Sequence, residues 1–132
     1  NMRLCSNVLA QQVVQTSLGG TQSVDELLLP GGRIYEQREF IYKAMNEIPG
    51  ISAVKPKAAF YIFPKIDTAM YNIHDDEQFV LDFLKQEKVM LVHGRGFNWK
   101  DPDHFRIVYM PRVDELAQIQ EKMTRFLSKY RQ

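Results

Sequence analysis

The segment "HFRIVYMPR" (residues 104–112) places one arginine inside a stretch that is otherwise typical of a buried β-strand. Its β-branched and aromatic residues suit a pleated, half-buried surface. Because successive strand residues point to opposite faces, Phe105, Ile107 and Tyr109 share one face of the expected strand. Arg106 shares the other face with the residues two positions before and after it, His104 and Val108. A permanent charge in this place needs an explanation.

The residues leave three explanations for Arg106 open. The first is a solvent-facing or edge strand, with the side-chain stem along the sheet and the guanidinium in water. The second is a buried ion pair with an aspartate or glutamate elsewhere, which is weak evidence of stability. The third is a bound anion, because the guanidinium fork matches a carboxylate or phosphate bidentately. Taken alone, the segment favours the first explanation.

Composition bounds the class of protein. The chain has 132 residues, of which 45% are hydrophobic and 25% charged, as expected for one globular domain. Its 17 basic and 16 acidic residues give a net charge of +1 without a cluster of lysine or arginine, so nucleic-acid binding is not supported. No apolar run approaches the roughly 18 residues of a membrane span, and no signal-peptide pattern is present. We therefore expect neither a nucleic-acid nor a membrane partner.

Cysteine and histidine usage gives no sign of a metal site. Cys5 is the only cysteine, which rules out an internal disulfide and fits a cytoplasmic protein. His74, His93 and His104 are irregularly spaced, without the ligand spacing of a zinc site. The run "HDD" at 74–76 stands at the start of an expected helix, where aspartates usually act as caps. We expect no bound metal.

The order of elements indicates the fold class. Apolar spacing predicts helices over residues 8–18, 33–48, 75–86 and 113–130, a short helical turn within 23–30, and strands over 57–64, 89–92 and 105–109. The near-continuous apolar run 57–64 is typical of a central strand. Strand, helix and strand with short joints over 57–92 predict a right-handed parallel crossover. The pattern predicts a small two-layer α/β domain of about three main strands, with helices packed on one face.

Residues 1–30 fit this domain poorly. The outward residues of the helix at 8–18 are small amides and hydroxyls, which is typical of a helix with protein on most sides. The chain also begins at Asn1 instead of a methionine. We expect a piece of a longer protein, in which residues 1–30 are poorly packed or lie against something else.

The connection "HGRGFNWKDPD" (93–103) is long and rich in glycine, and it carries the aromatic pair Phe97 and Trp99. Loops of this kind are often functional. A surface loop held down by its own aromatic residues is an equally good interpretation. The short "GRG" at 94–96 is too degenerate to indicate a phosphate-binding loop.

Three segments in this order carry a family resemblance: "PKAAFYIFP" (56–64), "VMLVHGRGF" (89–97) and "HFRIVYMPR" (104–112), closed by an amphipathic helix. Together they resemble the C-terminal portion of fold-type I, pyridoxal-phosphate-dependent class I/II aminotransferases. Within that family the chain is most similar to bacterial alanine aminotransferases of the glutamate–pyruvate type, over essentially all its residues. Many members have glycine where this chain has Ala58, which threatens no functional role.

The resemblance implies a division of the chain and a role for Arg106. Residues 1–30 would be the tail of the large cofactor-binding domain, and residues 31–132 the small C-terminal domain with its linking helix, Gly32 to Ile48. Arg106 stands where the family binds the α-carboxylate of the amino-acid substrate. The lysine that anchors pyridoxal phosphate lies upstream in the family. No catalytic or cofactor-binding residue is therefore expected in this segment, and the chain alone should be inactive.

The resemblance also implies properties of the parent protein. It would be a cytoplasmic homodimer that uses pyridoxal phosphate to transfer an amino group between alanine and 2-oxoglutarate, with amino acids and 2-oxo acids as substrates. A second class of function stays open from the residues alone. The chain could be a stand-alone α/β binding or regulatory module for a small carboxylate or a protein partner.

Overall fold

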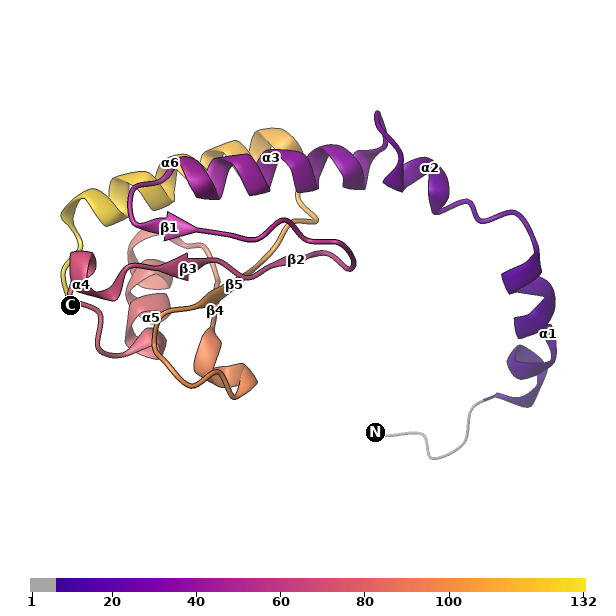
Figure 1. Cartoon of the computed structure of the whole chain (residues 1–132), viewed down its shortest axis with the longest axis horizontal. Coiled ribbons are helices and arrows are strands. Elements are labelled where there is room, and N and C mark those ends of the chain that lie inside the picture. The colour runs from indigo at the N-terminus through magenta and orange to yellow at the C-terminus, as the bar shows by residue number, and fades with distance from the viewer. Residues whose placement is uncertain (1–6) are drawn as a thin grey trace.

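Strand β5 (Phe105–Val108), which carries Arg106, is the central strand of a three-stranded antiparallel sheet with the order β2-β5-β4. Its neighbours are β2 (Tyr61–Ile62) and β4 (Val92–His93). A separate two-stranded ladder joins β1 (Ile51–Ser52) to β3 (Lys65–Ile66). These strands come from a computed structural model that describes residues 7–132 (Figure 1). Each is short, so the sheet is a small platform whose centre is β5.

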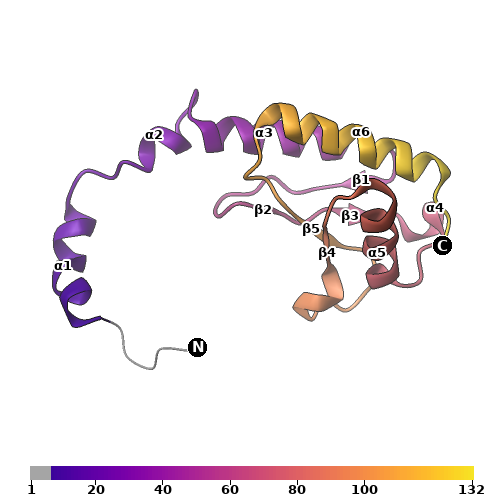
Figure 2. The same ribbon diagram turned by 180° about the vertical axis from the view of Figure 1, so that it is seen from behind.

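Four helices accompany the strands. They are α3 (Arg33–Glu47), α4 (Thr68–Tyr71), α5 (Asp76–Glu87) and α6 (Val113–Lys129). The long helices α3 and α6 lie side by side along one edge of the body, and α5 lies in front of the strands when the molecule is seen from behind (Figure 2). Between β4 and β5 the chain forms one turn of 3-10 helix, η1 (Gly94–Phe97).

The hydrophobic core lies between these helices and one face of β5. Phe105, Ile107 and Tyr109 are all buried there, as strand alternation predicts. The ring of Phe79 on α5 packs against Phe105 at a centroid distance of 5.6 Å. The apolar stripes of the long helices complete the core, and their buried members are Ile34, Ile41, Met45, Leu116, Met123, Phe126 and Leu127. The predicted two-layer α/β domain is confirmed.

The predicted directions of the strands also hold. Both β2 and β4 run antiparallel to β5, so they run parallel to each other, with α5 in the connection between them. They do not pair directly, because β5 lies between them.

The prediction of a central strand over 57–64 is wrong. Only Tyr61 and Ile62 form β2, and that strand lies at the edge of the sheet. Residues 57–60 are exposed, and Ala59 has a φ of 58°, a left-handed conformation that a β-strand does not contain. The long apolar run therefore reflects a turn followed by a short strand, and the central place goes to β5.

Two smaller expectations also need correction. In the predicted strand 89–92, only Val92 enters the ladder, where it is followed by His93. Leu84 follows the apolar spacing of α5 but is exposed, whereas Phe79, Val80 and Phe83 of the same helix are buried.

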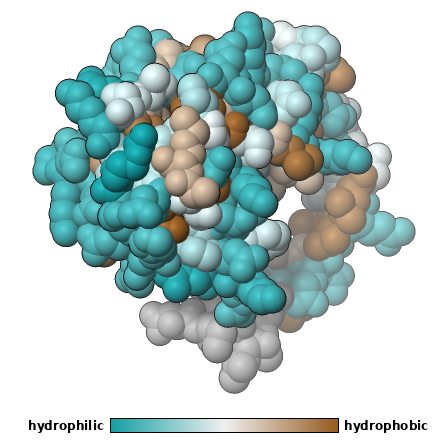
Figure 3. All heavy atoms as spheres, turned by 60° about the vertical axis from the view of Figure 1, so that its left-hand side comes forward, coloured by the Kyte–Doolittle hydropathy of each residue, from teal (hydrophilic) through white to brown (hydrophobic). Residues whose placement is uncertain are grey.

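The N-terminal arm stands apart from this body. It contains α1 (Val8–Gly19), capped by the Asn7 side chain at the backbone N–H groups of residues 9 and 10, and the single turn α2 (Asp25–Leu28). Every residue from 7 to 30 is exposed, and both ribbon views show α1 clear of the sheet (Figures 1 and 2). In the space-filling view the body is largely hydrophilic, and apolar residues gather on the right, where the arm recedes (Figure 3). The poor packing expected for residues 1–30 is confirmed for those described.

No helix within residues 7–132 is both long enough and apolar enough to span a membrane. Cys5 lies outside the described residues.

Hydrogen exchange should separate the arm from the body. A 12-residue helix without buried side chains is marginal in water, so the amides of α1 should exchange nearly as fast as those of an unfolded peptide. The amides of β5 and the middle of α6 should be the most protected, since they pack in the core. Protection of α1 equal to that of β5 in a demonstrated monomer would show that the arm is packed after all.

The left-handed conformation of Ala59 predicts an unusual pair of glycine variants. An alanine held there costs about 1–2 kcal/mol, which glycine avoids, whereas glycine costs roughly 0.5–1 kcal/mol through unfolded-chain entropy at an ordinary position. Ala59→Gly should therefore be more stable than Ala58→Gly by roughly 1 kcal/mol in urea unfolding. Ala58 is the matched control, because its φ is not positive. The opposite order would mean that residue 59 does not adopt this conformation.

Candidate functional site

The face of the sheet opposite the core carries Arg106 near its centre. Val92 on β4 lies directly across from Arg106, and Tyr61 on β2 lies across from Val108. The register of β2 with β5 continues as far as the bridge between Lys65 and His104, which places Phe63 opposite Arg106. Phe63 therefore lies on the same face. Tyr61 and Val108 are exposed. This outer face is therefore a platform of apolar and aromatic side chains around one arginine.

Two aromatic rings lie against the Arg106 guanidinium. Its central carbon is 4.6 Å from the ring centroid of Tyr61 and 4.5 Å from that of Phe97. At such distances each ring attracts the cation through its quadrupole. The rings leave Arg106 half-buried and restrict the orientations that its side chain can take.

Arg106 has no acidic partner among residues 7–132. Its Nε is buried and has no hydrogen-bond acceptor there. The buried-ion-pair explanation therefore fails for the described part of the chain. The simple solvent-facing explanation accounts poorly for a buried N–H donor and two ring contacts, since a buried donor without a partner costs about 1–3 kcal/mol. What the arrangement can do is present a planar fork of donors to an anion.

Phe97 reaches Arg106 because of the local structure that precedes it. The turn η1 starts directly after β4, and the Gly94 N–H donates to the His104 carbonyl at 2.8 Å. A Cβ at Gly94 would lie 2.7 Å from that carbonyl oxygen, so only glycine fits there. Asn98 ends the turn in a left-handed conformation. The glycines of this connection thus bring an exposed aromatic residue over the arginine.

A second aromatic group, which contacts Phe97 through Phe63, extends the platform. The ring of Phe63 stacks on His104 at 4.9 Å and meets Trp99 edge-on at 5.6 Å. Asp103 joins the group, since it accepts from the Trp99 indole at 2.9 Å and lies 2.7 Å from Nδ1 of His104. Burial alone would raise the pKa of Asp103, but these hydrogen bonds outweigh it and hold the pKa below its usual value.

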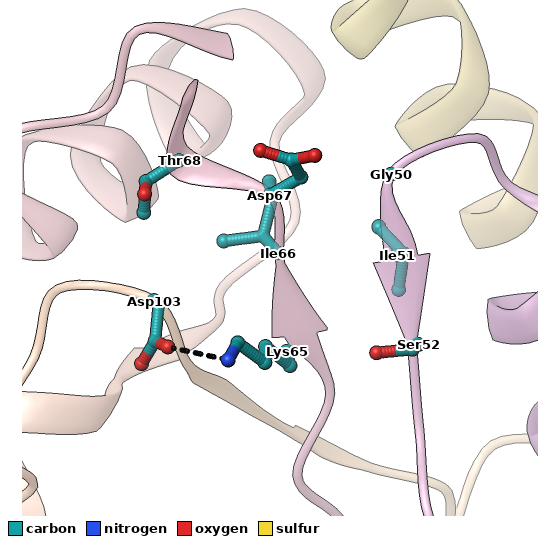
Figure 4. A pocket seen from close by; sticks show the side chains of 8 residues that line it. All are labelled: Gly50, Ile51, Ser52, Lys65, Ile66, Asp67, Thr68 and Asp103. Carbon is teal, nitrogen blue, oxygen red and sulfur yellow. Dashed lines mark ion pairs between the residues drawn. The ribbon is translucent and has the colours of Figure 1, made fainter. Parts of the chain in front are cut away.

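A hollow of about 510 Å³ lies beside this group and does not include Arg106 (Figure 4). Lys65 and Asp103 form an ion pair across it at 3.3 Å, and the Asp67 side chain caps α4. Its charged side chains are thus already engaged with the protein. This hollow has no group aimed at a ligand comparable to the Arg106 guanidinium.

The run at 74–76 behaves as a helix start. Asp75 caps α5 by accepting from the N–H groups of Glu77 and Gln78, as predicted. Asp76 is buried and binds Arg95, a contact that the sequence did not reveal. Within residues 7–132 no three histidine, cysteine or acidic side chains are grouped as a metal site would require.

The lysines of the described chain do not fit a site for pyridoxal phosphate. All are exposed except Lys122, which is half-buried and donates to the Glu87 carbonyl at 3.0 Å. Lys65 and Lys57 line hollows of about 510 and 280 Å³, but both side chains are exposed, and Lys65 is paired with Asp103. None of the described lysines is therefore enclosed as an anchor for the cofactor ring would be.

Sequence reasoning identified Arg106 and the loop at 93–103 but missed how they meet. The sequence shows Phe97 only as one of an aromatic pair in the loop, and it predicts a central strand at Tyr61. The signal for Phe97 was available, since two glycines flank one residue before it and allow a tight turn. Nothing local marks Tyr61 or Asp76.

Comparisons with known proteins show which family this chain is similar to. The chain is 58% identical over all 132 residues to glutamate-pyruvate aminotransferase AlaA of Haemophilus influenzae, of which it covers 33%. It is 52% identical over the same length to alanine aminotransferase of Mycobacterium tuberculosis, of which it covers 31%. The chain thus spans about a third of the length of these relatives. No protein-family model matches it.

Solved structures give the same result. An aminotransferase from Escherichia coli is 58% identical and superposes with a TM-score of 0.90 over 98% of this chain and 32% of that one. The alanine aminotransferase of Pyrococcus furiosus is 38% identical, with a TM-score of 0.81 over 96% of this chain and 31% of that one. Over its whole length the chain is homologous to the C-terminal third of bacterial alanine (glutamate–pyruvate) aminotransferases, and it belongs with them to the fold-type I, pyridoxal-phosphate-dependent aminotransferase family.

Proposed function

We propose that this chain is the C-terminal part of an aminotransferase in which Arg106 binds the α-carboxylate of the amino-acid substrate. The observation that supports this most strongly is the Arg106 guanidinium. It lies against two aromatic rings on the outer face of the sheet and has no acidic partner in residues 7–132. The parent enzyme would transfer an amino group between alanine and 2-oxoglutarate, because the similar proteins are named for glutamate–pyruvate and alanine transfer.

In this proposal Arg106 orients the substrate. Its fork pairs with both carboxylate oxygens, which fixes the direction in which the rest of the amino acid points. The rings of Tyr61 and Phe97 lie against the guanidinium, shield part of it from water and restrict its orientation. A charge pair shielded in this way is stronger than one in open solvent. Cofactor chemistry would then belong to residues outside 7–132, because no lysine in this range is enclosed as a cofactor anchor would be.

The exposed arm fits a division of the parent into domains. Residues 1–30 would be the tail of the large cofactor-binding domain, against which the apolar side chains of α1 pack. Residues 31–132 would form the small domain, with α3 as the linking helix. The full-length protein would be a cytoplasmic homodimer.

The first prediction concerns pyridoxal phosphate and the chain alone. Because the described lysines lie at the surface, added cofactor should give only weak, nonspecific absorbance changes, and the chain should not transaminate. Titration followed by absorbance and by mass spectrometry of the reduced adduct would measure this. Tight, stoichiometric labelling of a single lysine would contradict the proposal that the cofactor site lies elsewhere.

The second prediction concerns Arg106→Ala in the full-length parent. Removing a desolvated partner of a carboxylate costs about 2–5 kcal/mol, which corresponds to a loss of roughly 30- to several-thousand-fold in kcat/KM. The loss should be similar for alanine and glutamate, since both present the same α-carboxylate. Arg106→Lys should recover only part of the activity, because an ammonium cannot reproduce the planar fork. Folding and cofactor absorbance should survive in both variants.

Arg125→Ala is the matched control, because Arg125 lies on α6 and pairs with Glu87 away from the outer face. It should keep the activity of the wild type. A loss in the Arg106 variant with glutamate alone would mean that Arg106 binds the substrate side chain. Full activity with both substrates would return Arg106 to the solvent-facing explanation.

A further inference from the structure

Asp76 is the only buried acidic residue of the described chain, with 1% of its surface exposed. It is the first residue of α5, where a carboxylate is favoured by the helix dipole but does not need to be buried. Burial of a carboxylate is costly unless its oxygens are hydrogen-bonded. The position of Asp76 therefore suggests that its contacts matter beyond the start of this helix.

Both oxygens of Asp76 are used by one residue of η1. The Arg95 backbone N–H donates to Oδ2 at 2.8 Å, and Nε of the same residue contacts Oδ1. A second arm of the guanidinium reaches Asp75 at 2.6 Å. The Gln78 backbone N–H and this guanidinium help to hold the pKa of Asp75 below its usual value. Asp76 thus fixes both the backbone and the side chain of Arg95.

The residue before Arg95 is held by the sheet. The Gly94 N–H donates to the His104 carbonyl on the chain that leads into β5. The turn is therefore held between the start of α5 and the start of β5. Two residues after Arg95 comes Phe97, whose ring lies 4.5 Å from the Arg106 guanidinium carbon.

Phe97 has little support of its own. It is 47% exposed, and its one ring neighbour besides Arg106 among residues 7–132 is Phe63, in an edge contact at 6.4 Å. A half-exposed ring on a short turn keeps its place only if the backbone beneath it is held. The contact that holds this backbone on the α5 side is the one between Arg95 and Asp76.

We propose that the Asp76–Arg95 pair is a positioning device for Arg106, which acts by holding Phe97 over the guanidinium. The contribution of this pair to catalysis rests on the proposed role of Arg106, whereas the contacts of the pair are independent of that role. A guanidinium that is already oriented loses less side-chain entropy when a carboxylate binds. Asp76 is thus a positioning residue that acts on the substrate site through η1 and Phe97.

The test is an NMR measurement on Arg106 in the full chain, which needs no substrate. In the wild type, the Nε–Hε resonance of Arg106 should be shifted by the two rings, and its motion should be restricted. Asp76→Asn keeps the size of the side chain but removes its charge. It should move this resonance toward that of a free arginine and increase its motion. Phe97→Ala should do the same.

Glu87→Gln is the matched control. Glu87 is also a shielded carboxylate on α5 that pairs with an exposed arginine, Arg125, but it lies at the far end of the helix from η1. It should leave the Arg106 resonance unchanged. Arg95→Ala, which truncates an exposed side chain and leaves the backbone bond to Asp76, should shift the resonance in the same direction by less. Arg95→Ala also tests the proposal if Asp76→Asn does not fold.

The double variant decides the route of the effect. If Asp76 acts through Phe97, Asp76→Asn should add nothing to the change already seen in Phe97→Ala. A further change in that background would overturn the proposed route. An Arg106 resonance like that of the wild type in folded Asp76→Asn or Arg95→Ala would overturn the proposal itself.

In the full-length parent, Asp76→Asn should raise KM for both amino acids more than it lowers kcat. Loss of carboxylate binding by Arg106 is tested separately, by the activity of Arg106→Ala.

Discussion

The two-residue period of β5 is the constraint on which the rest of the structure depends. Phe105, Ile107 and Tyr109 are almost wholly buried, and together they fix the register of the central strand. A slip of one residue would bring Arg106 into the core and these three side chains into water. Because core packing on one face of β5 fixes its register, it also fixes the position of Arg106 on the opposite face. A binding group gains from a rigid strand in this way, since its position does not depend on a loop.

The two faces of the sheet have different roles: the inner face stabilises the fold, and the outer face carries the proposed binding group. The inner face packs against α3, α5 and α6 and supplies the apolar burial that stabilises the domain. The outer face is half-exposed and keeps a cationic group whose Nε has no acceptor in residues 7–132. Such a group is a cost to the folded chain, and the core offsets it. In the proposed function, a bound carboxylate pairs with this group and so removes the cost of leaving it unpaired.

Much of this arrangement could be predicted from the sequence, because it depends on local periodicity. Strand alternation assigned Phe105 and Ile107 to the core and Arg106 to the other face, and apolar stripes with glycine and proline stops gave the extents of α3 and α6 within a residue or two. These features need no knowledge of distant partners. The assignment of Arg106 to substrate, by contrast, came from family resemblance, since the residues alone left three explanations.

The failures share a different cause, which is dependence on pairing between distant segments. The run 57–64 is apolar enough for a central strand, but Ala59 turns the chain and β5 takes the middle place. Asp76 looked like one of two interchangeable caps. Its partner Arg95 is 19 residues away and belongs to a turn whose conformation no helical or strand period describes. Tyr61 and Phe97 meet at Arg106 only after both β2 and η1 have docked on β5.

The most direct test of the central claim is a crystal structure of the full-length parent with a bound amino acid or an unreactive analogue. Both oxygens of the α-carboxylate should lie about 2.7–2.9 Å from two nitrogens of the Arg106 guanidinium. Tyr61 and Phe97 should still flank it. A carboxylate held by other residues, with the Arg106 guanidinium left in solvent, would contradict the account.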